Sequence, residues 1–273
     1  MHLDKKWEVN GVPQTIEQVC PEWRELIGMI DIRVVHIPMV QENIEFLIGP
    51  VRSKILRETC RLAQACAENW GHKVLVAAHT ESNFELLEVQ EGFLPDLKDK
   101  VLSILDDYPL VELGIENVSP IQVVKGDLRL RGGIIDDNSR MVEYFNDPRI
   151  GTVFDTCHAK LTEMYVAALN QYNVFERYNF QSIAALHKDN AKLIHLATFE
   201  GNGYGKGHGL AIKDKLEMME FVRMYKSLGM TCPITLEVAE DNYLDSQSYL
   251  TTRRLLEECW TELGGELLEK RVA

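Results

Sequence analysis

Side chains that can bind metals or move protons stand at the C-terminal ends of six predicted strands. Acid–base and metal-dependent reactions need Asp, Glu and His side chains within reach of one another. The six residues are His36, His79, Glu116, Asp155, His195 and Glu237. The carboxylates among them repel one another when packed closely, and a divalent cation relieves that repulsion better than burial or protonation at neutral pH. If the strands converge, the sequence therefore predicts a metal centre.

The elements around these residues alternate between short β-rich runs and longer helical segments, which is typical of parallel strands joined by crossover helices. The predicted strands are Ile32–Val35, Lys73–Ala78, Val111–Ile115, Ile150–Phe154, Lys192–Ile194 and Ile234–Leu236. The predicted helices are Val51–Trp70, Leu94–Asp107, Asn138–Asn146, His158–Leu186 in two pieces, Lys213–Leu228 and Ser246–Leu263. Upstream, Lys6–Val9 and Thr15–Met29 would make a seventh βα unit. The predicted fold class is α/β, a TIM-type (β/α) barrel, because only a barrel brings six strand ends to one mouth.

Composition sets the class of protein. The chain has 273 residues, 45% of them hydrophobic, and its 29 basic and 42 acidic residues give a net charge of −13. This composition excludes a peptide or a fibre and is ordinary for one globular domain over residues 1–273 with a core large enough for an enzyme. The negative charge repels phosphate backbones, so we do not expect nucleic acid as a partner.

Targeting and redox signals are weak. No apolar run approaches the roughly 20 residues of a membrane span, and the N-terminus lacks a signal-peptide stretch, so we expect no membrane partner and a cytoplasmic location. Six cysteines without a CxxC pair indicate reduced and mostly buried thiols.

Each strand-end residue also has a simpler interpretation. Asp155 could cap the helix that follows it, and His36 could be a core histidine with satisfied hydrogen bonds. Glu116 could belong to a solvated turn, and Glu237 to an acidic surface. The metal hypothesis therefore depends on all six residues occurring together at strand ends, and not on any one of them alone.

Two loops could hold a substrate. The stretch GNGYGKGHG has glycine at every second position, so its backbone N–H groups, with Lys206 and His208, could bind a substrate or a phosphate, or the loop could simply be mobile. The stretch KGDLRLRGG supplies Lys125, Arg129 and Arg131, which could recognise an anion or form a solvated hairpin.

Six short segments carry a family resemblance. In order they are VHIP, AAH, GIENVS, FDTCH, IHLATFEGNG and TLEVAE. The ordered set resembles the xylose isomerase-like barrel superfamily, which includes sugar epimerases, inosose dehydratase-type enzymes and endonuclease IV. The resemblance covers about residues 30–262.

The resemblance implies one divalent ion, Mn²⁺, Mg²⁺, Co²⁺ or Zn²⁺, since three oxygen donors and one imidazole suit these metals. The matching ligands are Glu116, Asp155, His195 and Glu237. His158, three residues after Asp155, matches the histidine that contacts a substrate oxygen. His36 and His79 match positions that line the same mouth and are candidates for substrate binding.

The resemblance also indicates an incomplete barrel. The segment that carries His36 looks like the third strand of the family, but only about thirty residues precede it. We therefore expect a barrel that lacks the first βα unit of the family. An open barrel edge leaves unpaired backbone groups, which a second copy of the chain could pair in a homo-oligomer.

The function that the resemblance implies is a metal-dependent isomerase or epimerase of a sugar, polyol or sugar phosphate, working through a metal-stabilised enediolate. Glu116 and Glu237 would be the catalytic base and acid. A dehydratase would share the first step.

Two alternatives stay open. One is an apurinic-site endonuclease resembling endonuclease IV, for which His36, His79 and His158 are retained while Lys206 stands where that family has a metal-binding Asp. The other is a barrel that binds a ligand without catalysis.

Overall fold

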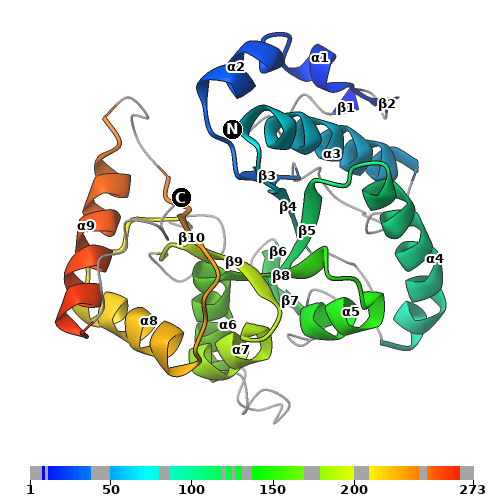
Figure 1. Ribbon diagram of the computed structural model, residues 1–273. Coiled ribbons are helices and arrows are strands. Elements are labelled where there is room, and N and C mark those ends of the chain that lie inside the picture. The colour runs from blue at the N-terminus through cyan, green and yellow to red at the C-terminus, as the bar shows by residue number, and fades with distance from the viewer. Residues whose placement is uncertain are drawn as a thin grey trace. The chain divides into compact units, whose positions relative to one another are not determined.

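The computed structural model describes most of the chain (Figure 1). The described residues are 8–9, 12–37, 50–79, 87–118, 121–124, 127–130, 137–168, 179–199, 209–239 and 245–264. The chain divides into two compact units, the first of Met1–Glu116 and Arg131–Gly151 and the second of Asn117–Leu130 and Thr152–Ala273. The expectation of one domain over residues 1–273 stays a prediction.

Parallel strands form the centre of the first unit. They are β3 (Val34–His36), β4 (Val74–His79) and β5 (Val111–Glu116). Five of the six residues of β4 are buried, as expected for an apolar strand covered on both faces. The register pairs His79 with Glu116 and His36 with Ala77, so the C-terminal ends of the three strands lie at one edge.

Three helices pack around these strands: α3 (Pro50–Trp70), α4 (Leu87–Asp106) and α5 (Asp137–Phe145) (Figure 1). Their inward side chains, among them Ile55, Leu97 and Phe145, are at most 1% exposed and join one core with the strands. The prediction that the second helix begins at Leu94 is wrong, because α4 continues through Pro95 instead of starting beside it.

The N-terminal segment does not form the predicted seventh βα unit. In the described residues, β1 (Glu8–Val9) pairs antiparallel with β2 (Val12–Pro13), and two short helices follow, α1 (Ile16–Val19) and α2 (Trp23–Met29). Ile16, Val19 and Trp23 are buried in the core of the first unit. The apolar residues here thus cover other elements instead of adding a strand to the parallel sheet.

The second unit repeats the strand–helix pattern. The strand β8 (Ile150–Asp155) begins in the first unit and ends in the second, where β9 (Ala191–Leu196) and β10 (Ile234–Leu236) run parallel to it. The helices are α6 (Thr156–Ala168), α7 (Phe180–His187), α8 (Lys215–Ser227) and α9 (Gln247–Glu262). An antiparallel hairpin, β6 (Ile121–Val124) with β7 (Asp127–Leu130), occupies part of the predicted cationic loop.

All six predicted parallel strands are confirmed, in the order β10-β9-β8-β5-β4-β3. Four strands end at the residue singled out in the sequence, His36, His79, Glu116 or Asp155. His195 is the penultimate residue of β9, and Glu237 directly follows β10. The predicted strand-end placement therefore holds for all six residues.

The burial of the cysteines agrees with the prediction from the sequence. All six cysteines are buried and form no disulfide. None of the helices in the described part of the chain is both long enough and apolar enough to traverse a bilayer.

Candidate metal centre

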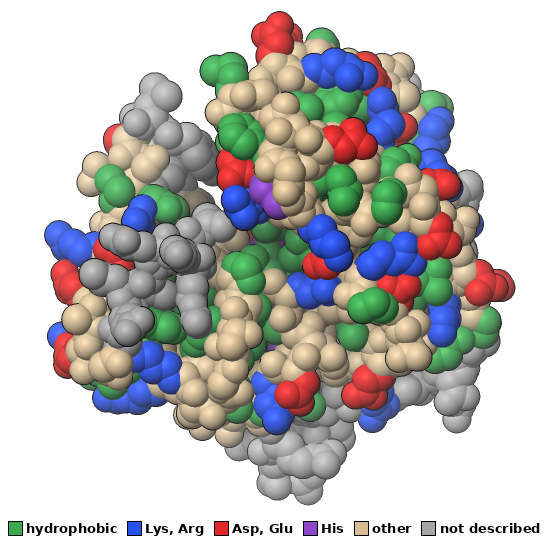
Figure 2. Space-filling model, in the orientation of Figure 1, with side chains coloured by type: hydrophobic (Ala, Val, Ile, Leu, Met, Phe, Trp, Pro, Cys, Tyr) green, Lys and Arg blue, Asp and Glu red, His purple; other side chains and the backbone are tan. Residues whose placement is uncertain are grey.

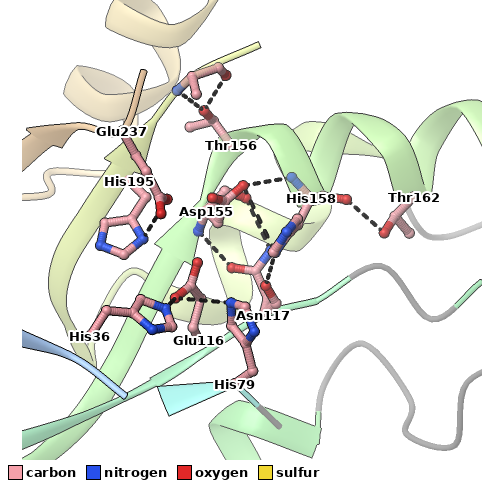
Figure 3. Close-up of polar contacts among 11 residues, drawn as sticks. His36, His79, Glu116, Asn117, Asp155, Thr156, His158, Thr162, His195 and Glu237 are labelled. Carbon is pink, nitrogen blue, oxygen red and sulfur yellow. Dashed lines mark hydrogen bonds and ion pairs between the residues drawn. The ribbon is translucent and has the colours of Figure 1, made fainter. Parts of the chain in front are cut away.

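Asp155, His195 and Glu237 come together in the second unit because they lie at the C-terminal ends of three parallel strands. One potential ligand atom from each of these side chains lies within 4.8 Å of the others (Figure 3). The Nδ1 atom of His195 is 2.9 Å from Oε2 of Glu237. Asp155 is fully buried and His195 is 3% exposed, whereas the side chain of Glu237 is 32% exposed. The group therefore has a dry base and one ligand that reaches solvent.

These donors suit a divalent cation. Two carboxylates and one imidazole are the ligand types that Mn²⁺, Co²⁺ and Zn²⁺ accept, and Mg²⁺ accepts the carboxylates. Placing two acidic side chains this close together with little solvent is unfavourable, unless a cation or protons compensate their negative charges. The residues present thus fit the metal that the family resemblance implies.

Asp155 also caps a helix, as its simpler interpretation predicted. It precedes α6, and its Oδ1 accepts a hydrogen bond of 2.6 Å from the backbone N–H of His158. That contact is the usual N-cap bond to the third helical residue. It uses one carboxylate oxygen, so capping and metal binding are compatible roles of the same side chain.

His158 lies on the first turn of α6 and is 2% exposed. Its Nδ1 is 2.6 Å from the backbone oxygen of Asn117, so Nδ1 carries the proton that this hydrogen bond requires. The ring of a neutral His158 then offers Nε2 as an acceptor. This geometry suits the predicted contact with a substrate hydroxyl.

Two residues that the sequence analysis missed hold the strand ends together. The side-chain amide of Asn117 bonds both the N–H and the C=O of Asp155, at 2.7 and 3.0 Å. The hydroxyl of Thr156 bonds the N–H and the C=O of Ala197, at 3.1 and 2.8 Å. The available signal was a small polar residue directly after a strand-end carboxylate, but this pattern is common in turns.

A second group of side chains lies at the strand ends of the first unit. The Oε2 atom of Glu116 is 2.9 Å from Nε2 of His36 and 3.5 Å from Nε2 of His79. The Nδ1 atom of His36 is 2.7 Å from the backbone oxygen of Ile37, so both nitrogens of this ring face oxygen acceptors. Either a fully protonated ring or a cation shared with Glu116 satisfies these contacts. Glu116 is 1% exposed, which excludes the solvated-turn interpretation.

Cys157 lies between Asp155 and His158 in the chain and is buried. Burial raises the pKa of its thiol, and the negative charge of Asp155 raises it further. Both effects favour the protonated thiol at neutral pH.

Several predicted substrate-binding residues lie outside the described residues. They are Lys206 and His208 of the glycine-rich stretch and Lys125 and Arg131 of the cationic loop. Arg129 lies in β7, and only its backbone is described. Their roles stay predictions.

Comparisons with known proteins give structural matches only. No protein-family model and no curated protein sequence matches this chain. The structure is similar to that of a D-tagatose 3-epimerase-like protein, with a TM-score of 0.57 and 18% identity over 90% of this chain and 86% of that chain. A D-psicose 3-epimerase determined in the presence of D-fructose gives a TM-score of 0.53 at 12% identity, over 90% and 87% of the two chains.

A third solved structure, a xylose isomerase domain protein from Alicyclobacillus acidocaldarius subsp. acidocaldarius, gives a TM-score of 0.52 at 17% identity, over 83% of this chain and 77% of that one. The chain has the xylose isomerase-like barrel fold. The described residues of the chain supply six parallel strands in this fold, fewer than the eight of a closed TIM barrel, as the incomplete-barrel prediction requires. In barrels of this type the active site lies at the C-terminal ends of the strands, which is where both groups of side chains lie.

Proposed function

We propose that the protein is a metal-dependent isomerase or epimerase acting on a sugar, polyol or sugar phosphate. The observation that carries this proposal is the convergence of Asp155, His195 and Glu237, with ligand atoms within 4.8 Å, at the ends of three parallel strands. The fold supports it, since the solved structures of similar fold include a D-psicose 3-epimerase.

In this proposal one divalent ion is held by four side chains. Asp155, His195 and Glu237 come from the second unit. Glu116, at the end of β5 in the first unit, is the fourth ligand that the family resemblance implies. The bound ion would supply positive charge to the carbonyl oxygen and the neighbouring hydroxyl oxygen of the substrate, which lowers the cost of removing the proton from the hydroxyl-bearing carbon next to the carbonyl.

The side chains of the protein perform the proton transfers. The carboxylate of Glu116 or Glu237 removes the carbon-bound proton. In epimerisation the other carboxyl group returns a proton to the opposite face of that carbon. In isomerisation a proton is returned to the neighbouring carbonyl carbon, and the hydroxyl proton passes to the former carbonyl oxygen, so that the carbonyl and hydroxyl groups exchange places. Nε2 of His158 accepts a hydrogen bond from a substrate hydroxyl and orients it, and His36 and His79 stand at the C-terminal ends of β3 and β4.

The first test is the metal content of the purified protein and of Glu237→Gln, measured by elemental analysis after exhaustive dialysis. We expect about one divalent ion per chain in the wild type and a large loss in the variant, because the amide oxygen of Gln is a much weaker ligand than a carboxylate. Glu112→Gln is the matched control, because Glu112 lies on β5 and forms an ion pair with Lys73. Wild-type protein without any divalent ion would contradict the proposal.

The second test is proton exchange at carbon. A panel of ketoses, aldoses and their phosphates is incubated with the metal-loaded protein in D₂O, and NMR measures deuterium incorporation next to the carbonyl. We expect incorporation that Glu237→Gln reduces by about 10²-fold or more, as for removal of a general acid or base. Elimination of water from a substrate would instead assign a dehydratase.

A second candidate function is favoured by the group of His36, His79 and Glu116, which could hold a further cation. A site with several metals would suit cleavage of a phosphodiester at an apurinic site. Acidic and basic side chains are interspersed on the face that Figure 2 shows, and the net charge is −13, so neither favours binding to DNA. Several zinc ions per chain together with nicking of abasic DNA would assign this function instead.

A further inference from the structure

Asn117 makes three hydrogen bonds with Asp155 and His158 of the proposed site. It is 5% exposed and follows β5 directly. Its backbone N–H bonds the C=O of Val153 at 3.3 Å, and its side chain makes two bonds with the backbone of Asp155. Its backbone oxygen accepts the 2.6 Å bond from the ring of His158. The side chain of Asn117 thus extends the strand pairing by one residue, and the backbone oxygen of Asn117 holds the ring of His158 (Figure 3).

The chemistry of these contacts requires an amide side chain. Oδ1 faces the N–H of Asp155, and Nδ2 faces its C=O, so a flipped amide would oppose donor to donor and acceptor to acceptor. Aspartate at this position would place a second oxygen against the C=O of Asp155. Leucine has nearly the same shape and can form neither bond.

The contact with His158 sets which ring nitrogen carries a proton. A carbonyl oxygen can only accept, so Nδ1 is protonated, and in the neutral ring the lone pair lies on Nε2. At the same time the backbone N–H of His158 bonds Oδ1 of Asp155. Asn117 therefore contacts both ends of the turn that joins these two residues.

We propose that Asn117 is a positioning residue that fixes Asp155 for metal binding and holds His158 in the Nδ1–H form for substrate binding. The proposal rests on the proposed function, because it assigns how that site is held. Since Asn117 is also bonded to Glu116 in the chain, it connects three residues of the site.

The first experiment needs no metal. In wild-type protein, ¹H–¹⁵N correlation NMR of the histidine rings is expected to show the proton of His158 on Nδ1, and the amide of Asp155 is expected to exchange slowly. In Asn117→Leu we expect the Asp155 amide to exchange about tenfold faster, because it loses its acceptor. A wild-type His158 with its proton on Nε2, or an Asp155 amide that exchanges equally in both proteins, overturns the proposal.

The second experiment measures the binding of Mn²⁺ by isothermal titration calorimetry. We expect Asn117→Leu to raise the dissociation constant by about 10–100-fold, the usual effect of removing a residue that orients a ligand. Asn138→Leu is the matched control, because Asn138 is 3% exposed and its Nδ2 has no hydrogen-bond partner among the described residues. A folded Asn117→Leu that binds Mn²⁺ within twofold of the wild type overturns the proposal.

The outcomes separate this proposal from the proposed function. Wild-type protein that binds no Mn²⁺ contradicts the metal-dependent function, whereas the exchange and NMR readouts still decide the role of Asn117. If Asn117→Leu does not fold, Asn117→Ala removes the same acceptor without the bulk of leucine, and the wild-type form of the His158 ring remains decisive. Faster Asp155 exchange in Asn117→Ala supports the proposal, and unchanged exchange overturns it.

Discussion

Individual residues in this protein combine structural and chemical roles. Asp155 caps α6 through one carboxylate oxygen and lies within 4.8 Å of the ligand atoms of His195 and Glu237. A cap and a ligand are often treated as competing interpretations of an Asp after a strand. Here both are satisfied, because a carboxylate has two oxygens and the N-terminus of a helix favours negative charge.

His187 is the clearest case of a buried ionisable group with no role in the proposed site. It ends α7, is fully buried, and packs 5.3 Å from the ring of Phe154. Neither of its ring nitrogens has a hydrogen-bond partner among the described residues. Burial lowers the pKa of His187 to about 4, from an ordinary value of 6.5.

This lowered pKa predicts a loss of stability in acid. Above pH 6.5 the ring is neutral in both states, so it adds no pH dependence. As the pH falls from 6.5 to 4, the unfolded chain takes up a proton that the folded chain refuses, which lowers the free energy of unfolding by about 3 kcal/mol. Urea unfolding of wild type and His187→Leu across this range measures the difference.

Between pH 6.5 and pH 4 we expect the free energy of unfolding of His187→Leu to fall by about 3 kcal/mol less than that of the wild type. Above pH 6.5 the free energies of unfolding of the two proteins should change with pH in parallel. Other groups titrate equally in both proteins and cancel in the comparison. Parallel curves from pH 7 to pH 4 would show that a protonated His187 is accommodated in the fold.

At the scale of elements, side chains extend the strand pairing at the C-terminal edge of the strands in the second unit. Asn117 bonds the backbone of Asp155, and Thr156 bonds the backbone of Ala197. Each side chain bonds backbone N–H and C=O groups where regular pairing stops, so these buried backbone groups keep hydrogen-bond partners. The ends of β8 and β9 are thereby held at fixed positions.

Thr156→Val tests this bridging role. The variant keeps the shape of the side chain but leaves the N–H and the C=O of Ala197 without the hydroxyl, so we expect a loss of about 1–3 kcal/mol in the free energy of unfolding. Thr59→Val is the matched control, because Thr59 is also buried and its hydroxyl donates only to Ile55, one helical turn away. That change should cost about 0.5 kcal/mol or less. Equal losses in the two variants would assign Thr156 no bridging role.

Sequence periodicity predicted the parallel strands and the residues at their ends because buried strands form short apolar runs, as in VLVAAH of β4. It failed at the N-terminus, where apolar residues such as Ile16 and Trp23 pack on the core without joining the sheet. It also missed Asn117 and Thr156, since a hydrogen bond to a distant backbone leaves no periodic signal. These contacts depend on strand register, which tertiary packing decides.

At the scale of the whole molecule, the boundary between the two units runs through a strand. Ile150 and Gly151 of β8 belong to the first unit, and the strand continues in the second from Thr152. All six residues of β8 are buried. Chains longer than about 150 residues commonly unfold through intermediates, and units joined by an exposed linker can melt separately.

We expect a single unfolding transition here, because a buried strand shared by both units cannot lose its pairing in one unit while the other stays intact. Differential scanning calorimetry should give one peak whose calorimetric and van't Hoff enthalpies agree. Gly151→Pro is the informative variant, because proline removes a backbone N–H at the boundary and disfavours an interior strand position. It should lower the midpoint of the whole transition without splitting it. Two resolved peaks in the wild type would show that the units fold independently and would contradict the single-domain prediction.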